Sequence, residues 1–246
     1  MRRGSRRAPL MLLGALLALQ APAAAFAEGA RLPEATPRWR GGVLFDDEVR
    51  AALRLRTDAA RTQAAAVSDW LVRFLFGLPL LLNAWLAGTV LRGRLSLAAQ
   101  LLLCSVLALS LTGLAQGLVS RGVGRERPYV QECVRPAPPP DCLRGEAAGQ
   151  VSFYSGHAAT AAAGATLAWH LARYAPTGLA LLRRLVRAAA VFAAIGTASL
   201  RVLADRHYAT DVIAGALAGV ALTLFTARLL RFISAPAPDV GTPHLS

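Results

Sequence analysis

Long apolar stretches recur along the chain, and this repetition limits the possible folds more than any other feature of the sequence. Each stretch is close to the ~20 residues with which a helix crosses about 30 Å of hydrocarbon. Hydrophobic residues make up 55% of the 246 positions and the mean hydropathy is +0.44, which is high for a soluble domain. We therefore expect an all-α integral membrane protein, a helical bundle with one membrane domain.

Five spans are predicted in that domain, at about residues 71–91, 95–119, 153–174, 188–200 and 211–227. The fourth is short, and the arginines on either side of it can extend their side chains towards the interface. In the fifth, Gly215 and Gly219 form a G-x-x-x-G pattern, which weakly indicates close helix packing. The alternative is the ordinary small-residue content of an Ala-rich helix.

The segments outside the spans have other patterns. Residues 1–27 have a basic start, an apolar core and a small-x-small cleavage site, which indicates a secretory signal peptide. If it is retained as a signal anchor, the protein has six spans. Residues 28–70 form an exported leader, in which 46–70 has the pattern of an amphipathic helix on the bilayer surface or capping the domain. The membrane domain then covers 71–232, and 233–246 form a cytoplasmic tail.

The chain is strongly basic, with a formal net charge of +13, and all 27 basic residues are arginine. Such a charge can indicate nucleic-acid binding. Here, however, the arginines cluster at the ends of apolar runs rather than on one soluble face. Anionic lipid headgroups and membrane topology explain them better, so no nucleic-acid partner is expected.

Two short basic segments predict the orientation. Residues 92–94 and 173–187 contain arginine and no acid, which assigns both to the cytoplasm by the positive-inside rule. The signal peptide independently places the leader outside. The loop at 120–150 and the segment 201–211 then lie on the exported, periplasmic face of a bacterial inner membrane.

Cys133 and Cys142 flank a proline-rich stretch of the exported loop. In an oxidising compartment they can form a disulfide that closes this stretch. The alternative is two free thiols, which thiol labelling of the unreduced protein would detect.

Three polar segments fall on the exported side: "SRGVGRERP" at 120–128, "YSGH" at 154–157 and "SLRVLADRHYATD" at 199–211. The first N–H groups of a helix lack internal partners and favour anions, and Ser155 and Gly156 stand at such a start. Arginine guanidinium groups bind phosphate oxygens in a bidentate manner. Together the three segments predict a phosphate site.

Two histidines suit phosphoryl chemistry at that site. His207 and Asp211 are four residues apart, on one face if the segment is helical. A carboxylate bonded to one ring nitrogen leaves the other nitrogen able to attack, and His157 could protonate the leaving oxygen. His and Asp at this spacing also suit a metal, but the arginines would repel a divalent cation, so no metal is expected. A purely structural role, with arginines on lipid headgroups and histidines at the interface, stays open.

The three segments resemble the signature of the type 2 phosphatidic acid phosphatase superfamily: K-x6-R-P, P-S-G-H and S-R-x5-H-x3-D. The resemblance extends over about residues 120–211. The matching positions are Arg127 and Pro128 in the first motif, Ser155, Gly156 and His157 in the second, and Arg201, His207 and Asp211 in the third.

The chain departs from this signature in a few places. Ser120 stands in the Lys position of the first motif, and Arg121 and Arg125 are candidates for the missing phosphate contact. One residue turns a helix by about 100°, so Arg121 does not automatically replace the lysine. Tyr154 stands where the second motif has Pro, and Leu200 where the third has Ser.

The resemblance implies a metal-independent phosphatase that needs no cofactor. His207 would attack phosphorus and form a phosphohistidine, Asp211 would orient it, and His157 would protonate the leaving group. The phosphoryl oxygens would be held by Arg127, Arg201, Ser155 and the Gly156 amide. Water would then hydrolyse the intermediate.

A site at the membrane–water boundary suits a lipid phosphate or pyrophosphate whose tail stays in the bilayer. Undecaprenyl pyrophosphate, phosphatidic acid and phosphatidylglycerol phosphate are substrates of the family, and the sequence does not choose among them. Soluble phosphomonoesters remain possible. So do a non-catalytic protein that binds anionic lipid and a phosphotransferase with the same intermediate. The sequence does not indicate an oligomeric state.

Overall fold

The structure, a computed structural model, describes residues 38–134, 138, 142 and 149–230. The predicted signal peptide and the C-terminal tail lie outside these residues. Within them the chain is helical, with no strand and one isolated bridge between Trp39 and Arg125, which confirms the all-α prediction. The helices are α2 (Asp46–Leu53), α3 (Asp58–Gly88), α4 (Leu95–Val123), η1 (Pro128–Glu132), α6 (Gly156–Leu171), η3 (Ala172–Tyr174), η4 (Thr177–Leu179), α7 (Ala180–Leu203) and α8 (Ala209–Leu229).

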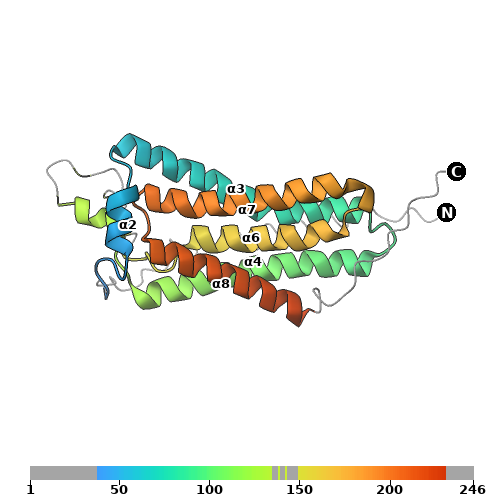
Figure 1. Ribbon diagram of the computed structural model, residues 1–246. Helices are drawn as coiled ribbons and strands as arrows, with labels where there is room; N and C mark the ends of the chain where they lie inside the picture. Colours follow the sequence, from blue (N-terminus) through green and yellow to red (C-terminus); the bar gives the residue numbers. More distant parts are fainter. Residues whose placement is uncertain (1–37, 135–137, 139–141, 143–148, 231–246) are drawn as a thin grey trace. The chain divides into compact units, whose positions relative to one another are not determined.

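Helix α6 lies at the centre of the bundle (Figure 1). It packs against α3, α4, α7 and α8. Its sequence is rich in alanine, and most of its residues are buried. Small side chains allow four neighbouring helices to approach one axis closely, which is why this helix takes the central place.

The start of α6 is packed closely against α8 through two glycines. A Cβ atom at Gly215 would clash with the carbonyl oxygen of Ser155, and one at Gly219 would clash with that of Ala159. Any larger residue would push the helices apart. The G-x-x-x-G pattern therefore marks a helix contact, as the sequence predicted.

Among the described residues, three helices, α3, α4 and α8, are long and apolar enough to cross a membrane. They correspond to the first, second and fifth predicted spans. Helices α6 and α7 lie where the third and fourth were expected, with 16 and 24 residues. Helix α7 is longer than its predicted span because it includes the arginine-containing stretch before residue 188, which the sequence analysis treated as a connection.

The segment before the first span differs from the prediction of one helix over 46–70. Helix α2 ends at Leu53, and α3 begins at Asp58 after a break. The hydroxyl oxygen of Thr57 caps this start by accepting a backbone N–H of the first turn at 3.3 Å. Helix α3 then continues through residue 70, so the structure shows no division there between leader and membrane domain.

Candidate active site

The three polar segments meet at one end of the bundle, where α4 and α7 end and α6 and α8 begin (Figure 1). The Ser155 backbone N–H donates to the Asp211 carbonyl oxygen at 3.0 Å, which joins the starts of α6 and α8. The Ser152 backbone N–H donates to the Arg125 carbonyl oxygen at 2.8 Å, which joins the first segment to the second. The close packing of α6 on α8 fixes the distance between the second and third motifs.

His207 lies between α7 and α8 and is buried, with 3% of its surface exposed. Its Nδ1 atom is 2.9 Å from the Ser152 carbonyl oxygen. A carbonyl can only accept, so Nδ1 carries the hydrogen and Nε2 carries the lone pair. Asp211 Oδ2 is 3.7 Å from Nδ1, which is beyond hydrogen-bond distance. The ring therefore has the orientation expected of a nucleophile. Its Nδ1 hydrogen, however, is bound by a backbone carbonyl oxygen and not by the carboxylate that the sequence predicts.

Burial also decides the charge of His207. Removal from water lowers its pKa to about 3, and the positive charge of Arg127 acts in the same direction. The ring is therefore neutral at physiological pH. A neutral imidazole with its lone pair on Nε2 is the form that can attack phosphorus.

Asp211 acts on His207 through Ser152. Its Oδ2 atom accepts hydrogen bonds from the Ser152 hydroxyl at 2.5 Å and from the Tyr208 backbone N–H at 3.0 Å. Its Oδ1 atom accepts from Arg125 at 2.6 Å. The Ser152 hydroxyl donates to Asp211, and the Ser152 carbonyl oxygen accepts from His207. Ser152 therefore links the carboxylate to the ring.

Arg125 is fully buried and belongs to the support of the site. Its guanidinium donates to Asp46 at 2.8 Å as well as to Asp211, and it lies 4.4 Å from the ring centroid of Trp39 and 4.2 Å from that of Tyr208. Two carboxylates already balance its charge. We therefore do not keep Arg125 among the candidate phosphate ligands.

A tight turn separates Ser120 and Arg121 from Arg127. Gly124, with φ of +61°, ends α4 in the left-handed conformation, and the chain turns towards the site after it. Ser120 is buried in the bundle, with its hydroxyl 3.4 Å from the Gly117 carbonyl oxygen, whereas Arg121 is exposed. Neither is shown to contact the histidines. Arg127 follows the turn, and its backbone N–H donates to the Gly149 carbonyl oxygen at 2.7 Å.

Ser155 and Gly156 form the start of α6. The Ser155 hydroxyl caps the helix by accepting the Ala158 N–H at 3.4 Å. A Cβ atom at Gly156 would lie 3.1 Å from the Gln116 side chain of α4, so only glycine leaves this backbone uncovered without shifting that side chain. The start of a helix suits an anion, so Ser155 and the Gly156 amide stay candidate phosphate ligands.

His157 has a different partner, which the sequence analysis did not identify. Its Nε2 atom is 2.8 Å from Asp69 Oδ1 of α3. The same oxygen accepts a hydrogen bond from Arg201 at 3.1 Å. The side chains of His157 and Asp69 are 32% and 42% exposed, so this pair lies at the surface of the site. The positive charges of Arg127 and Arg201 act on both His157 and His207.

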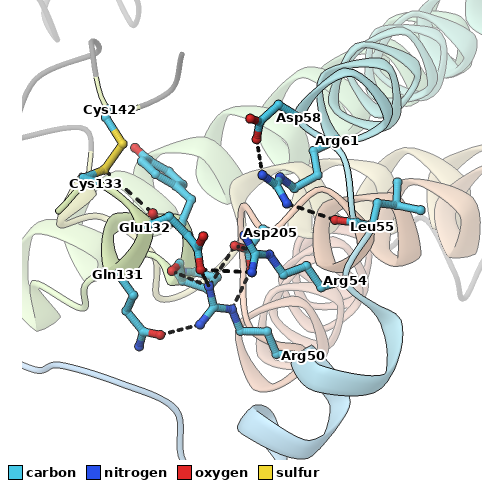
Figure 2. A network of polar contacts seen from close by, with 12 residues as sticks. Arg50, Arg54, Leu55, Asp58, Arg61, Gln131, Glu132, Cys133, Cys142 and Asp205 are labelled. Atoms are coloured by element: carbon cyan, nitrogen blue, oxygen red, sulfur yellow. Dashed lines mark hydrogen bonds and ion pairs between the residues drawn. A yellow bond between two sulfur atoms is a disulfide. The ribbon is translucent and has the colours of Figure 1, made fainter. Parts of the chain in front are cut away.

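Helix α2 holds the loop that carries His207 (Figure 2). Arg50 binds the carboxylate of Asp205 through Nε at 2.7 Å and Nη2 at 2.9 Å, and Arg54 lies 3.0 Å from the same carboxylate. Asp205 has φ of +59°, an unfavourable conformation for a residue other than glycine. The two arginines compensate for it, so α2 caps this end of the bundle and stabilises the turn before His207.

A disulfide joins Cys133 and Cys142, with a Cα–Cα distance of 5.6 Å (Figure 2). The neighbouring Glu132 accepts a hydrogen bond from Arg54 at 3.0 Å. The crosslink therefore closes the loop beside the contacts of α2.

A groove of about 400 Å³ opens beside His157 between α3, α4 and α6. Its lining includes Val72, Phe76, Gly113, Gln116, Thr160 and His157. The lining also includes Arg73 and Gly156, so the groove combines apolar and polar groups beside His157.

Comparison with known families decides the classification. Residues 101–234, more than half of the chain, match the PAP2 superfamily. The chain belongs to the PAP2 superfamily. Among solved structures, this PAP2 protein is similar to the first transmembrane PAP2-type phosphatidylglycerolphosphate phosphatase from Bacillus subtilis, with 21% identity over 77% of this chain and 94% of that one and a TM-score of 0.41. A search of curated proteins found no match.

The site of this PAP2 protein includes residues that motif spacing did not reveal. Asp69, Asp46 and Ser152 lie outside the three motifs, and each makes a hydrogen bond to a motif residue or its support. Asp69 had one signal in the sequence: it is an acid only two residues before a long apolar run. Such an acid is costly near lipid unless it has a partner.

Proposed function

We propose that the protein is a metal-independent membrane phosphatase that hydrolyses a lipid phosphate or pyrophosphate through a phosphohistidine on His207. The observation that carries this proposal is the geometry of that ring. It is buried and neutral, its Nδ1 hydrogen is held by a backbone carbonyl, and its Nε2 lone pair is left for attack.

The surrounding charges support phosphoryl transfer. Arg127 and Arg201 supply positive charge near both histidines, and the uncovered start of α6 supplies N–H donors. A phosphoryl group gathers negative charge on its oxygens during transfer, and guanidinium and N–H groups stabilise that charge without a metal.

The groove supports a lipid as the substrate. Val72 and Phe76 of α3 give it apolar lining, Arg73 adds a positive charge, and it reaches His157. An acyl or prenyl chain in this groove would place its phosphate at the polar end of the bundle. Positive-inside charges favour the exported face of the bacterial inner membrane for that end. The phosphates of undecaprenyl pyrophosphate, phosphatidic acid and phosphatidylglycerol phosphate all fit this description.

The test is phosphate release by the purified full-length protein in detergent, with a chelator present, on those three lipids. We expect His207→Ala to lower kcat at least about 10³-fold because it removes the nucleophile. His170→Ala, at the opposite end of α6, is the matched control and should keep the wild-type rate.

Three results would contradict the proposal. Full activity of His207→Ala would exclude a phosphohistidine at this position. Lipid binding without any phosphate release by the wild type would favour a non-catalytic lipid-binding protein. Transfer of the phosphoryl group to an added alcohol in preference to water would favour a phosphotransferase.

A further inference from the structure

Asp69 is placed to serve the second histidine of the site. It lies in α3, outside the three motifs and outside residues 101–234 that match the family. One of its carboxylate oxygens accepts hydrogen bonds from both His157 Nε2 at 2.8 Å and Arg201 Nη1 at 3.1 Å. A single oxygen thus bridges the proposed general acid and a proposed phosphate ligand.

The surrounding structure holds Asp69 in this position. The neighbouring Ser68 is buried, and its hydroxyl accepts a second hydrogen bond from Arg201 at 3.2 Å. Further along the same two helices, a Cβ atom at Gly164 would clash with the carbonyl oxygen of Leu75, so α3 and α6 are in close contact. Close packing fixes the register of the two helices and therefore the pairing of Asp69 with His157.

The pairing of Asp69 with His157 suits the chemistry of a general acid. The acid must carry its proton before the transfer, but Arg201 brings a positive charge to the same place. A second positive charge on the imidazole ring is unfavourable there unless an anion lies beside it. Asp69 supplies that anion at hydrogen-bond distance.

We propose that Asp69 is a positioning residue for the general acid: its carboxylate binds the Nε2 hydrogen of His157 and favours the protonated form of the ring, with the Nδ1 hydrogen directed to the leaving oxygen. This inference rests on the proposed function. Under this proposal the two histidines differ in their hydrogen-bond partners. His207, the proposed nucleophile, binds a backbone carbonyl, and His157, the proposed general acid, binds a carboxylate.

The proton follows a balanced route. When His207 Nε2 forms its bond to phosphorus, the bond from phosphorus to the leaving oxygen breaks, and that oxygen takes the proton from His157 Nδ1. His157 is then neutral, with its remaining hydrogen on Nε2 against Asp69. In the second step water attacks phosphorus, its proton goes to His157 Nδ1, and the bond electrons return to His207 Nε2.

The leaving group provides the test. An alkyl phosphate such as octyl phosphate needs a proton on its departing alkoxide, whereas p-nitrophenyl phosphate releases a stable phenolate without one. For the full-length Asp69→Asn protein we expect kcat on octyl phosphate to fall about 10- to 100-fold, and kcat on p-nitrophenyl phosphate to stay within about threefold. A residue that only supports the fold would lower both rates together.

Three variants control this test. Asp58→Asn changes an exposed acid in the first turn of the same helix and should leave both rates unchanged. Asp69→Glu keeps the charge and should recover part of the octyl phosphate rate, which also covers the case in which Asp69→Asn does not fold. His157→Asn should show the same leaving-group pattern, and adding Asp69→Asn to it should cost nothing further.

The outcomes separate this inference from the proposed function. If the wild type hydrolyses both phosphates and Asp69→Asn loses both equally, or loses neither, the inference is wrong and the phosphatase remains. A faster Asp69→Asn enzyme would also overturn it, since the carboxylate would then only obstruct the site. If the wild type hydrolyses neither compound and no lipid phosphate, the proposed function itself is wrong.

Discussion

The two histidines of the site have contrasting surroundings. The side chain of His207 is 2% exposed and is held by a backbone carbonyl inside a network of buried ions, whereas that of His157 is 32% exposed and pairs with a carboxylate at the surface. Burial and a neutral acceptor suit a ring that must keep a lone pair. A nearby anion and contact with water suit a ring that must gain and lose protons.

The largest expected effect comes from breaking the buried network on the His207 side. In Arg125→Leu two buried carboxylates, Asp46 and Asp211, lose their counter-ion. We expect the free energy of unfolding to fall by about 3–5 kcal/mol, measured by thermal or denaturant unfolding in detergent. Arg121→Leu changes an exposed arginine four residues earlier and should shift it by less than about 0.5 kcal/mol. Equal changes in the free energy of unfolding of the two variants would show that the buried network does not stabilise the fold more than an exposed arginine does.

Reduction of the disulfide, which also lies on the His207 side of the site, should lower the free energy of unfolding by less. It closes a loop between cysteines nine residues apart, beside the contact of Glu132 with Arg54. Reduction should lower the free energy of unfolding by about 2–3 kcal/mol, seen as a lower unfolding temperature with reductant present. Cys104→Ala should respond to reductant like the wild type, because Cys104 is free and buried. An unchanged unfolding temperature on reduction would contradict the prediction.

The smallest effect per step of the experiment is the change of stability with each unit of pH. The pKa of His207 is lowered to about 3 in the folded protein, below that of an unfolded histidine near 6.5. The unfolded chain therefore takes up a proton first. Stability from this ring is complete above about pH 6.5 and falls by about 1.4 kcal/mol per pH unit below it, towards the folded pKa.

Unfolding temperatures of the wild type and His207→Asn between pH 7 and 4.5 measure this slope, which should be shallower in the variant. Asp46 acts in a separate window: burial raises its pKa, but hydrogen bonds from Arg125 and Thr210 outweigh burial and leave the pKa below its ordinary value. Its contribution is lost only below about pH 4. Parallel curves for wild type and variant above that pH would show that His207 is not held neutral by the fold.

Patterns local in sequence could predict much of this molecule. Apolar length predicted the all-α bundle and its long helices, and Gly215 and Gly219 indicated the contact of α8 with α6. Charge patterns predicted that the three polar segments lie on one side of the membrane, and the bond from Ser155 to Asp211 joins two of them at one end of the bundle. These features depend on residues a few positions apart, where helix periodicity makes side chains neighbours.

The contacts that complete the site could not be predicted in this way. Arg50 reaches Asp205 across 155 positions, and Asp69 reaches His157 across 88. No periodicity connects such distant residues. The sequence therefore predicts only an amphipathic leader before the first span and does not show its contacts with the site. The sequence leaves Arg125 as one candidate for phosphate for the same reason, since its carboxylate partners lie 79 and 86 positions away.

The long reach of α2 has a consequence for the order in which the protein is made. Asp46 is synthesised early, but its partner Thr210 emerges from the ribosome 164 residues later, at the start of the last described helix. The early segment therefore lacks this partner until the last described helix has been made. The loop that carries His207 gains these contacts only at that point, so a chain arrested before α8 lacks the assembled candidate site.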